Sequence, residues 1–130
     1  SANLSDKNLK RIKSTKKNGG SRLDWSNNKD LQLKAYQNKD NSFMDVYGRM
    51  KWDEPAPTIT TRFNSLSNGR FGHPEENRAL SLREGATLQT FPKDYIFIGQ
   101  NDTDIALQIG NAVPPLFAEI LGKSIMEIKA

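Results

Sequence analysis

A helix with a marked beginning and a marked end lies in the second half of the chain, and it limits how its neighbours can fold. Ser81 is followed three residues later by Glu84, which is the spacing of a capping box, where each side chain bonds the backbone N–H of the other residue. The helix therefore begins near Leu82, and Leu82 and Ala86 lie on one stripe. Pro92 prevents its continuation, because proline disfavours helical backbone at the preceding residue. The pattern predicts a short, half-buried helix.

A second helix is expected near the start of the chain. Ser5 is a candidate N-cap, and the helix would end at about Lys13. Its apolar residues Leu9 and Ile12 would face the core, which leaves Arg11 outward together with the neighbouring lysines. The residues that follow are rich in Lys and Gly and indicate a flexible basic loop.

Two more helices are expected at the end of the chain. Asp102 or Asp104 can cap a helix that runs through Gln108 and stops at residues 110–111. Pro114 suits the first position of a closing helix, where its missing N–H costs nothing. The apolar stripe of this closing helix consists of Phe117, Ile120, Leu121, Ile125 and Ile128.

Two short segments have the composition of β-strands. Residues 43–47 carry Phe, Val and Tyr in near alternation, and residues 57–61 place β-branched side chains after a proline, which suits the edge of a sheet. A further extended piece is expected at residues 31–36, and residues 64–74 form a polar loop with an Asn-Gly turn signal. We therefore predict an α+β fold, a small irregular domain of short strands, loops and a few helices.

The length and the composition suggest that the chain is incomplete. With 130 residues there is room for one modest core, but not for a large enzyme domain as well. A hydrophobic content of 35% and a mean hydropathy of −0.71 indicate long polar loops or a surface that something else normally covers. The chain also begins with Ser rather than Met, and we interpret these features together as a sign of trimming.

Cysteine is absent and histidine occurs once. This composition excludes a disulfide framework and a thiol nucleophile, and it speaks against a zinc site, which needs three or four ligands at set spacings. We find no apolar run of membrane-spanning length and no signal peptide in the sequence. We therefore expect a soluble cytoplasmic protein without a metal and without a membrane partner.

Positive charge is concentrated in the first third of the chain. Residues 1–42 hold ten Lys or Arg against four Asp, a balance of +6, whereas residues 43–130 hold nine against eleven acidic residues, a balance of −2. A basic segment suggests a polyanionic partner, because Lys and Arg displace counterions from phosphates. A solvated Lys-rich loop is the alternative, and composition alone favours it.

Three segments, in order, resemble motifs of one enzyme family. Residues 78–92, Arg-Ala-Leu-Ser-Leu-Arg-Glu-Gly-Ala-Thr-Leu-Gln-Thr-Phe-Pro, resemble motif IX of the DNA cytosine-C5 methyltransferases, and residues 108–115, Gln-Ile-Gly-Asn-Ala-Val-Pro-Pro, resemble motif X. Residues 47–61 resemble the end of the family's target-recognition region. The resemblance implies a target-recognition region at residues 1–74, followed by the two closing motifs at residues 75–130.

The resemblance also implies a cofactor, and it excludes catalysis by this chain alone. The family's reaction needs a thiolate nucleophile, but the chain has no Cys and no match to the family's catalytic motifs. At the positions of Asn111 and Val113, family members contact S-adenosylmethionine, and at the position of Thr58 they bond the DNA backbone. Asn111 could instead be a left-handed C-cap residue, and Thr58 could be a strand residue packed through its methyl group.

The polar loop and the basic loop supply further candidates for DNA contact, although each could be only a surface residue. These candidates are Arg62, Asn64, Asn68, Arg70, His73, Lys16 and Lys17. We assign no catalytic role to Arg83 or Glu84, because the capping box already occupies the Glu84 carboxylate. Trp25 and Trp52 are expected to pack in the core or at a hinge rather than to stack on bases.

These observations favour the C-terminal portion of a DNA (cytosine-5-)-methyltransferase from a bacterial restriction-modification system. Its cofactor is then S-adenosylmethionine, and its partners are double-stranded DNA and an N-terminal catalytic domain of the larger α/β enzyme. Without that domain, the stripe at residues 116–128 should fold back over the helix at Leu82 and residues 95–98, or pair with a second copy. A stand-alone DNA-binding module without methyltransferase activity is the alternative, although it offers no obvious use for the segment Gln-Ile-Gly-Asn-Ala-Val-Pro-Pro.

Overall fold

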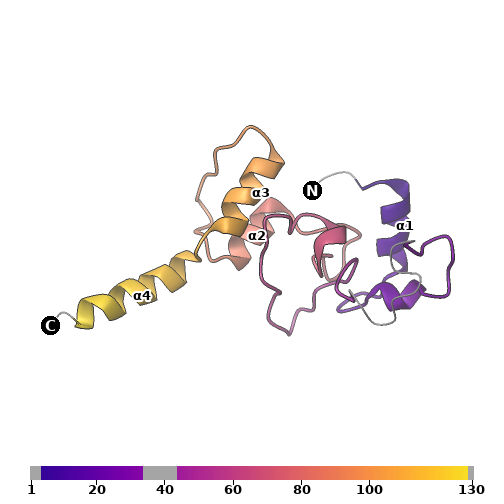
Figure 1. Ribbon diagram of the computed structural model, residues 1–130, viewed down its shortest axis with the longest axis horizontal. Helices are drawn as coiled ribbons and strands as arrows, with labels where there is room; N and C mark the ends of the chain where they lie inside the picture. Colours follow the sequence, from indigo (N-terminus) through magenta and orange to yellow (C-terminus); the bar gives the residue numbers. More distant parts are fainter. Residues whose placement is uncertain (1–3, 34–43, 129–130) are drawn as a thin grey trace.

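A computed structural model describes residues 4–33 and 44–128. The described chain is elongated, with α1 at one end and α4 projecting from the other (Figure 1). The helical elements, in chain order, are α1 (Asp6–Ser14), the 3₁₀ turns η1 (Arg22–Trp25) and η3 (Leu66–Asn68), and the helices α2 (Leu82–Leu88), α3 (Asp102–Asn111) and α4 (Pro115–Ile128).

Helix α1 begins as predicted, but one of its side chains points the other way. The Oγ of Ser5 accepts a hydrogen bond from a backbone N–H of the first turn at 3.4 Å, and Ile12 is fully buried. Arg11, which we expected to be exposed, is buried: its Nε donates to the backbone oxygen of Leu31 at 2.8 Å, and its guanidinium lies 5.0 Å from the centre of the Tyr47 ring. The hydrogen bond and the cation–π contact compensate for burying the charge.

Helix α2 confirms the predicted capping box. The Oγ of Ser81 accepts a hydrogen bond from the N–H of Glu84 at 3.2 Å, and the Glu84 carboxylate accepts one from the N–H of Ser81 at 2.8 Å. The helix begins at Leu82 and its last residue is Leu88. The backbone N–H groups of Ser81 and Glu84, which have no partner within the helix itself, are therefore both paired by the capping box.

The N-cap of α3 is Asn101, and the predicted caps Asp102 and Asp104 are wrong. The Asn101 side chain accepts hydrogen bonds from the N–H groups of Thr103 and Asp104 at 2.9 and 3.1 Å. The extended backbone of Asn101, with φ of −158° and ψ of 173°, is the conformation that an N-cap residue requires. Both aspartates then lie in the first turn, where their negative charge interacts favourably with the positive end of the helix dipole.

The predicted boundary between α3 and α4 was nearly correct. Helix α3 ends at Asn111, as the stop at residues 110–111 predicted, and Ala112 is extended, with φ of −72° and ψ of 143°. Because Asn111 is itself helical, its alternative role as a left-handed C-cap residue is wrong. Helix α4 begins one residue later than predicted, with Pro115 rather than Pro114 at its first position.

The predicted α+β fold is wrong, because the described part of the chain contains no strand. In the described residues, β-type backbone pairing is limited to two isolated bridges, one between Arg49 and Gly72 and one between Gly72 and Ala79. Of the first predicted strand, residue 43 lies outside the described residues and residues 44–47 form turns. Tyr47 has a left-handed backbone with φ of +58°, which ends any extended run.

The second predicted strand is an irregular segment that packs through a single apolar side chain. In residues 57–61, Ile59 is buried while its neighbours Thr58 and Thr60 are exposed. Buried and exposed side chains therefore alternate as predicted, but the segment packs against the core without pairing to another strand. Half of the extended piece predicted at residues 31–36 lies outside the described residues, and Leu31 belongs to a turn.

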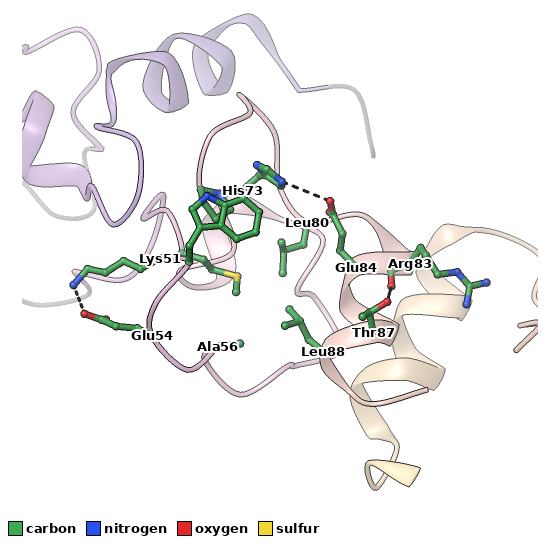
Figure 2. Close-up of a pocket in the computed structure, with 12 residues that line it drawn as sticks. Lys51, Glu54, Ala56, His73, Leu80, Arg83, Glu84, Thr87 and Leu88 are labelled. Atoms are coloured by element: carbon green, nitrogen blue, oxygen red, sulfur yellow. Dashed lines mark hydrogen bonds and ion pairs between the residues drawn. The ribbon is translucent and has the colours of Figure 1, made fainter. Parts of the chain in front are cut away.

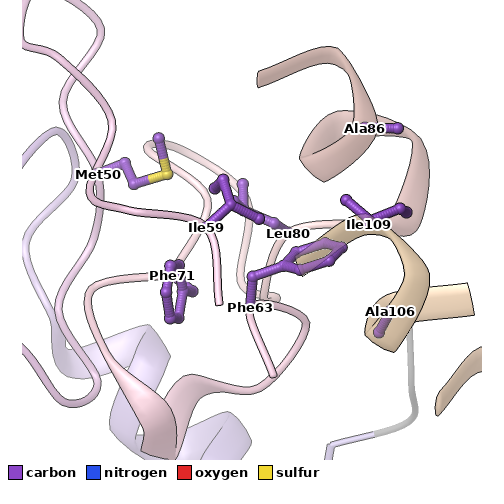
Figure 3. Close-up of a cluster of buried hydrophobic side chains, with 8 residues drawn as sticks. All are labelled: Met50, Ile59, Phe63, Phe71, Leu80, Ala86, Ala106 and Ile109. Atoms are coloured by element: carbon purple, nitrogen blue, oxygen red, sulfur yellow. The ribbon is translucent and has the colours of Figure 1, made fainter. Parts of the chain in front are cut away.

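The buried side chains form two clusters. The first, which we call the α2/α3 core, consists of Met50, Ile59, Phe63, Phe71, Leu80, Ala86, Ala106 and Ile109 (Figure 3). The second, the α1 core, consists of Ile12, Trp25, Leu31, Val46, Tyr47, Leu66 and Ala79. Each cluster takes members from both sides of residue 74. Packing therefore does not follow the predicted division at that residue, and the division stays a prediction.

Helix α4 projects from the rest of the molecule, and none of its residues is buried (Figure 1). The exposed apolar side chains on it are Leu116, Phe117, Ile120, Leu121, Ile125, Met126 and Ile128. The expected exposure of the apolar stripe is confirmed. The expected folding back over α2 and residues 95–98 is wrong, and pairing with a second copy stays a prediction.

The stretch Asp102–Ile128 is long and apolar enough to cross a membrane by length and composition, although the sequence analysis expected no such stretch. It consists of two helices separated by the extended Ala112. Ala106 and Ile109 of α3 are buried in the α2/α3 core. The first half of the stretch therefore packs on the α2/α3 core through these two residues, and one such stretch is weak evidence for a membrane span.

Candidate functional site

Two glycines allow α2 and α3 to touch the segment that ends at Phe63. A Cβ atom on Gly85 of α2 would lie 2.1 Å from a ring carbon of Phe63, and a Cβ atom on Gly110 of α3 would lie 2.4 Å from the backbone nitrogen of Thr61. Both distances are far inside van der Waals contact, so only glycine fits there without movement. The segment is therefore held directly against the helix that ends at Asn111.

The side chain of Gln89 joins the end of α2 to the end of α3. Its Nε2 donates to the backbone oxygens of Ile109 at 3.0 Å and Ala112 at 3.3 Å, at the end of α3, where backbone oxygens lack the usual helical partner four residues on. The next residue, Thr90, has a left-handed backbone with φ of +64°, and its Oγ1 accepts a hydrogen bond from the N–H of Leu116 at 3.2 Å. The connection between α3 and α4 is thus held from the α2 side.

Asn111 and Val113, the candidates for contact with S-adenosylmethionine, lie on that connection and face outward. Asn111 is exposed, and Val113 is 60% exposed. Within the described residues the Asn111 side chain makes no hydrogen bond, so its two donors and its acceptor are available to a hydroxyl or a ring nitrogen. Contact of Asn111 and Val113 with the cofactor stays a prediction.

The candidates for DNA contact differ in their exposure. Thr58, Arg62 and Asn68 are exposed, whereas Asn64 is half-buried. In the described part of the chain, the Arg62 side chain makes no hydrogen bond or ion pair, and the Asn68 amide donates only to the Oγ of Ser67 at 3.2 Å. These side chains are therefore free to reach phosphates or base edges.

Arg70, in contrast, is engaged by the protein itself. Its Nη1 donates to the backbone oxygens of Gly19 at 3.1 Å and Gly20 at 3.3 Å, and its Nε donates to the carboxylate of Asp45 at 3.1 Å. These bonds tie the basic loop to the middle of the chain. The geometry favours a structural role for Arg70, and its contact with bases stays a prediction.

Lys16 and Lys17 lie on the loop that Arg70 holds, and both are exposed. The Lys16 ammonium lies 3.9 Å from the carboxylate of Asp24, with 83% of its side chain exposed. Such a pair is weak and easily exchanged for another anion. Both lysines are therefore accessible to phosphates.

His73 is buried and serves as a hydrogen-bond acceptor inside a turn. It is 9% exposed, and its Nδ1 accepts hydrogen bonds from the N–H groups of Glu75 at 3.1 Å and Glu76 at 3.0 Å. Because Nδ1 is an acceptor, the neutral ring carries its proton on Nε2, which lies 3.7 Å from the carboxylate of Glu84. The ring is used within the fold, and its contact with DNA stays a prediction.

Glu84 has a second partner besides its capping contact. Arg78 donates two hydrogen bonds of 2.7 Å to the Glu84 carboxylate and another of 2.7 Å to Glu76. The hydrogen bonds from Arg78, with those from Ser81, lower the pKa of Glu84 to about 2, and the same contact raises the pKa of Arg78 above its ordinary value. A carboxylate this firmly ionised is a poor general base at neutral pH, which supports a structural role for Glu84.

Sequence reasoning missed Arg49, which joins α1 to the turn after His73. It is 1% exposed, and burial lowers the pKa of Arg49 from its ordinary value. Its guanidinium donates, over 2.5–3.0 Å, to the backbone oxygens of Ile12, Thr15, His73 and Glu76 and to the side-chain oxygen of Asn77. Nothing in the charge pattern distinguishes Arg49 from the exposed arginines.

A cavity of about 310 Å³ opens between residues 50–56 and α2 (Figure 2). Leu80 and Leu88 are part of its apolar wall, and Trp52 borders it with 60% of its surface exposed. Trp52 is therefore not a core residue, and its expected alternative, packing at a hinge, stays a prediction, whereas Trp25 is buried as expected. Apart from His73, no candidate for DNA or cofactor contact lines this cavity.

Comparison with known proteins identifies the family. A family model described as C-5 cytosine-specific DNA methylase matches residues 2–127. The chain belongs to this methylase family. With no cysteine in its sequence, this methylase chain lacks the thiolate that attacks cytosine in such a reaction.

Curated relatives of the methylase chain come from bacteria, animals and plants. It is 46% identical over 126 residues to Type II methylase M.HgiDII of Herpetosiphon aurantiacus, a match that covers 94% of this chain and 35% of the relative. It is 42% identical over 93 residues to DNA (cytosine-5)-methyltransferase 1 of Mus musculus, covering 71% of this chain and 6% of the relative. Type II methyltransferase M1.BsuMI of Bacillus subtilis is 42% identical over 83 residues, a match that covers 64% of this chain and 19% of the relative. The chain thus spans about a third or less of each of these relatives.

Proposed function

We propose that this chain is the C-terminal portion of a DNA (cytosine-5-)-methyltransferase that uses S-adenosylmethionine. In this proposal, residues 1–74 recognise the DNA target and residues 75–130 are the family's closing motifs IX and X. The complete enzyme is the modification half of a type II restriction-modification system in a bacterial cytoplasm. The chain by itself transfers no methyl group.

The uncovered face of α4 is the observation that carries the proposal. Phe117, Ile120 and Ile125 are each more than half exposed, and contiguous apolar surface of this kind marks a contact with another surface. The relatives contain more chain than this one matches, and we infer that the catalytic domain in that additional chain receives α4. A stand-alone DNA-binding module, the alternative, gives no reason for this face.

Each candidate residue then has a role in binding or positioning. When bound, S-adenosylmethionine supplies the methyl group. The Asn111 amide would orient a polar group of the cofactor, and the Val113 side chain would pack beside it. Thr58 and Arg62 would hold the DNA backbone while the target cytosine is out of the base stack.

A chimera tests the proposal. The matching segment of M.HgiDII is replaced by this chain, and methylation of duplex DNA is measured with labelled S-adenosylmethionine. We expect the chimera to label DNA and the isolated chain to leave it unlabelled. Asn111→Ala in the chimera should raise the KM for S-adenosylmethionine more than it lowers kcat, because it removes a contact that binds the cofactor. The exposed Asn27, which lies in a turn far along the chain from α3, supplies the matched control Asn27→Ala.

Two results would count against the proposal. The first is labelling by the isolated chain above a control without protein. The second is a chimera that is folded and binds DNA but never methylates it, while unaltered M.HgiDII is active in the same assay. The second result would favour the stand-alone module.

A further inference from the structure

One face of α1 carries lysines that no acidic side chain neutralises within residues 4–33 and 44–128. Lys7, Lys10 and Lys13 are exposed and occur every third residue, and none of them forms an ion pair there. At 1.5 Å of rise per residue they span about 9 Å along the helix. Asp6, in the first turn, is the single acidic residue of α1.

The lysine face is held in a fixed orientation. Ile12 on the opposite side is fully buried in the α1 core. The guanidinium of Arg11 adds hydrogen bonds to two residues outside the helix, the backbone oxygen of Leu31 at 2.8 Å and the hydroxyl oxygen of Tyr47 at 3.4 Å. Because the helix cannot rotate on its axis without breaking these contacts, a partner would lose little freedom in aligning with it.

The lysine face is also continuous with the basic loop. Helix α1 ends at Ser14 and leads directly into residues 15–20, which carry Lys16 and Lys17. This loop is fixed by Arg70 through Gly19 and by a hydrogen bond of 2.8 Å from the N–H of Asn18 to the oxygen of Pro74. The loop thus connects the lysine face to Arg70, another candidate for DNA contact.

We infer that the lysine face of α1 binds phosphates of duplex DNA beside the target sequence. The inference rests on the proposed function, and it adds a contact outside the recognition loop. A duplex carries one negative charge per about 1.7 Å of its axis, so a row of about 9 Å faces several phosphates and covers about three base pairs. Lysine is a point charge without a bidentate fork, so the contact is independent of base sequence.

A pair of matched double variants tests the inference with the 130-residue chain and duplex DNA. Lys10→Ala with Lys13→Ala removes two charges from the lysine face. Lys93→Ala with Lys123→Ala removes two exposed lysines elsewhere, of which Lys123 lies on α4 at the other end of the molecule (Figure 1). Affinity is measured by fluorescence anisotropy across a salt series, on two DNA duplexes of unrelated sequence. Circular dichroism verifies that each variant keeps its helix content.

For the α1 variant we expect the slope of log K against log salt to decrease by about 1.8, which is about 0.9 for each phosphate that the protein no longer neutralises. Its affinity should decrease by the same factor on both duplexes, while the control variant, with the same change in net charge, keeps the slope of the unaltered chain. Equal slopes for the two variants would overturn the inference and leave only a general charge effect. If Lys16→Ala with Lys17→Ala weakens binding while the α1 variant does not, the proposed function stands and this inference fails. An unaltered chain that binds no DNA contradicts both.

Discussion

Replacing Gly85 by alanine tests the close contact between α2 and Phe63. The new Cβ would lie 2.1, 2.4 and 2.7 Å from three ring carbons of Phe63, and that ring is fully buried in the α2/α3 core. Forcing an extra carbon into a packed core costs about 1–3 kcal/mol, and a clash on three ring atoms belongs in the upper part of that range. Alanine in place of a helical glycine returns about 1 kcal/mol. We therefore expect Gly85→Ala to lower the free energy of unfolding by about 1–2 kcal/mol.

Urea denaturation followed by circular dichroism measures this effect. With a denaturant slope of about 2 kcal/mol per molar urea, the midpoint should fall by about 0.5–1 M. Gly122→Ala on α4 is the matched control, because a Cβ there meets no atom within 4 Å and only the gain in helix propensity remains. Adding Phe63→Leu to Gly85→Ala should recover part of the loss, since the smaller side chain makes room. If Gly85→Ala stabilises the protein as much as Gly122→Ala does, the inferred contact is absent.

Three further predictions concern polar contacts. Glu84→Gln should lower the free energy of unfolding by about 1–2 kcal/mol at pH 7, after allowance for solvent screening of a carboxylate that is one-third exposed. Because the pKa of Glu84 is lowered to about 2 in the folded protein from an ordinary 4.5, this stabilisation is complete above about pH 4.5 and is lost as the pH falls towards 2, so the unfolding curves of variant and unaltered chain should converge in that window. Asn101→Ala should cost about 1 kcal/mol in a melting experiment, and Asp102→Ala clearly less, if Asn101 is the true cap. Arg49→Met removes the guanidinium donor from five acceptors, of which the oxygens of Ile12 and Glu76 keep another donor, and a loss of at least about 3 kcal/mol in the free energy of unfolding is expected; a cooperative melt close to that of the unaltered chain would contradict the role given to Arg49.

The sequence predicted the features that depend on neighbours in the chain. The Ser81 and Glu84 capping box needs only a spacing of three residues, and the structure confirms it. The family could also be identified, since ordered motifs carry that information and the family model matches nearly the whole chain. The exposure of the α4 stripe was correct for a related reason, because Phe117 and Ile120 have no partner within so short a chain.

Features that depend on distant contacts could not be predicted. The buried positions of Arg11 and Arg49 depend on carbonyl groups far away in the sequence, and an arginine looks the same in a sequence whether it is exposed or buried. The left-handed Tyr47 converts a strand-like pattern into turns, although its composition favours extended backbone. Arg70 was a candidate for DNA contact because it lies in a polar loop, and the hydrogen bonds of its guanidinium to Gly19 and Gly20 could not be predicted from that position.

Gly110 packs so closely on the backbone of Thr60 and Thr61 that no side chain would fit between them. Thr58, proposed to contact DNA, lies two residues before this contact, and Asn111, proposed to contact the cofactor, lies one residue after it. Ordering one of these segments therefore restricts the other, so that the second binding event loses less conformational entropy than it would alone. Such coupling is reciprocal: S-adenosylmethionine should strengthen DNA binding by the same factor by which DNA strengthens the binding of S-adenosylmethionine.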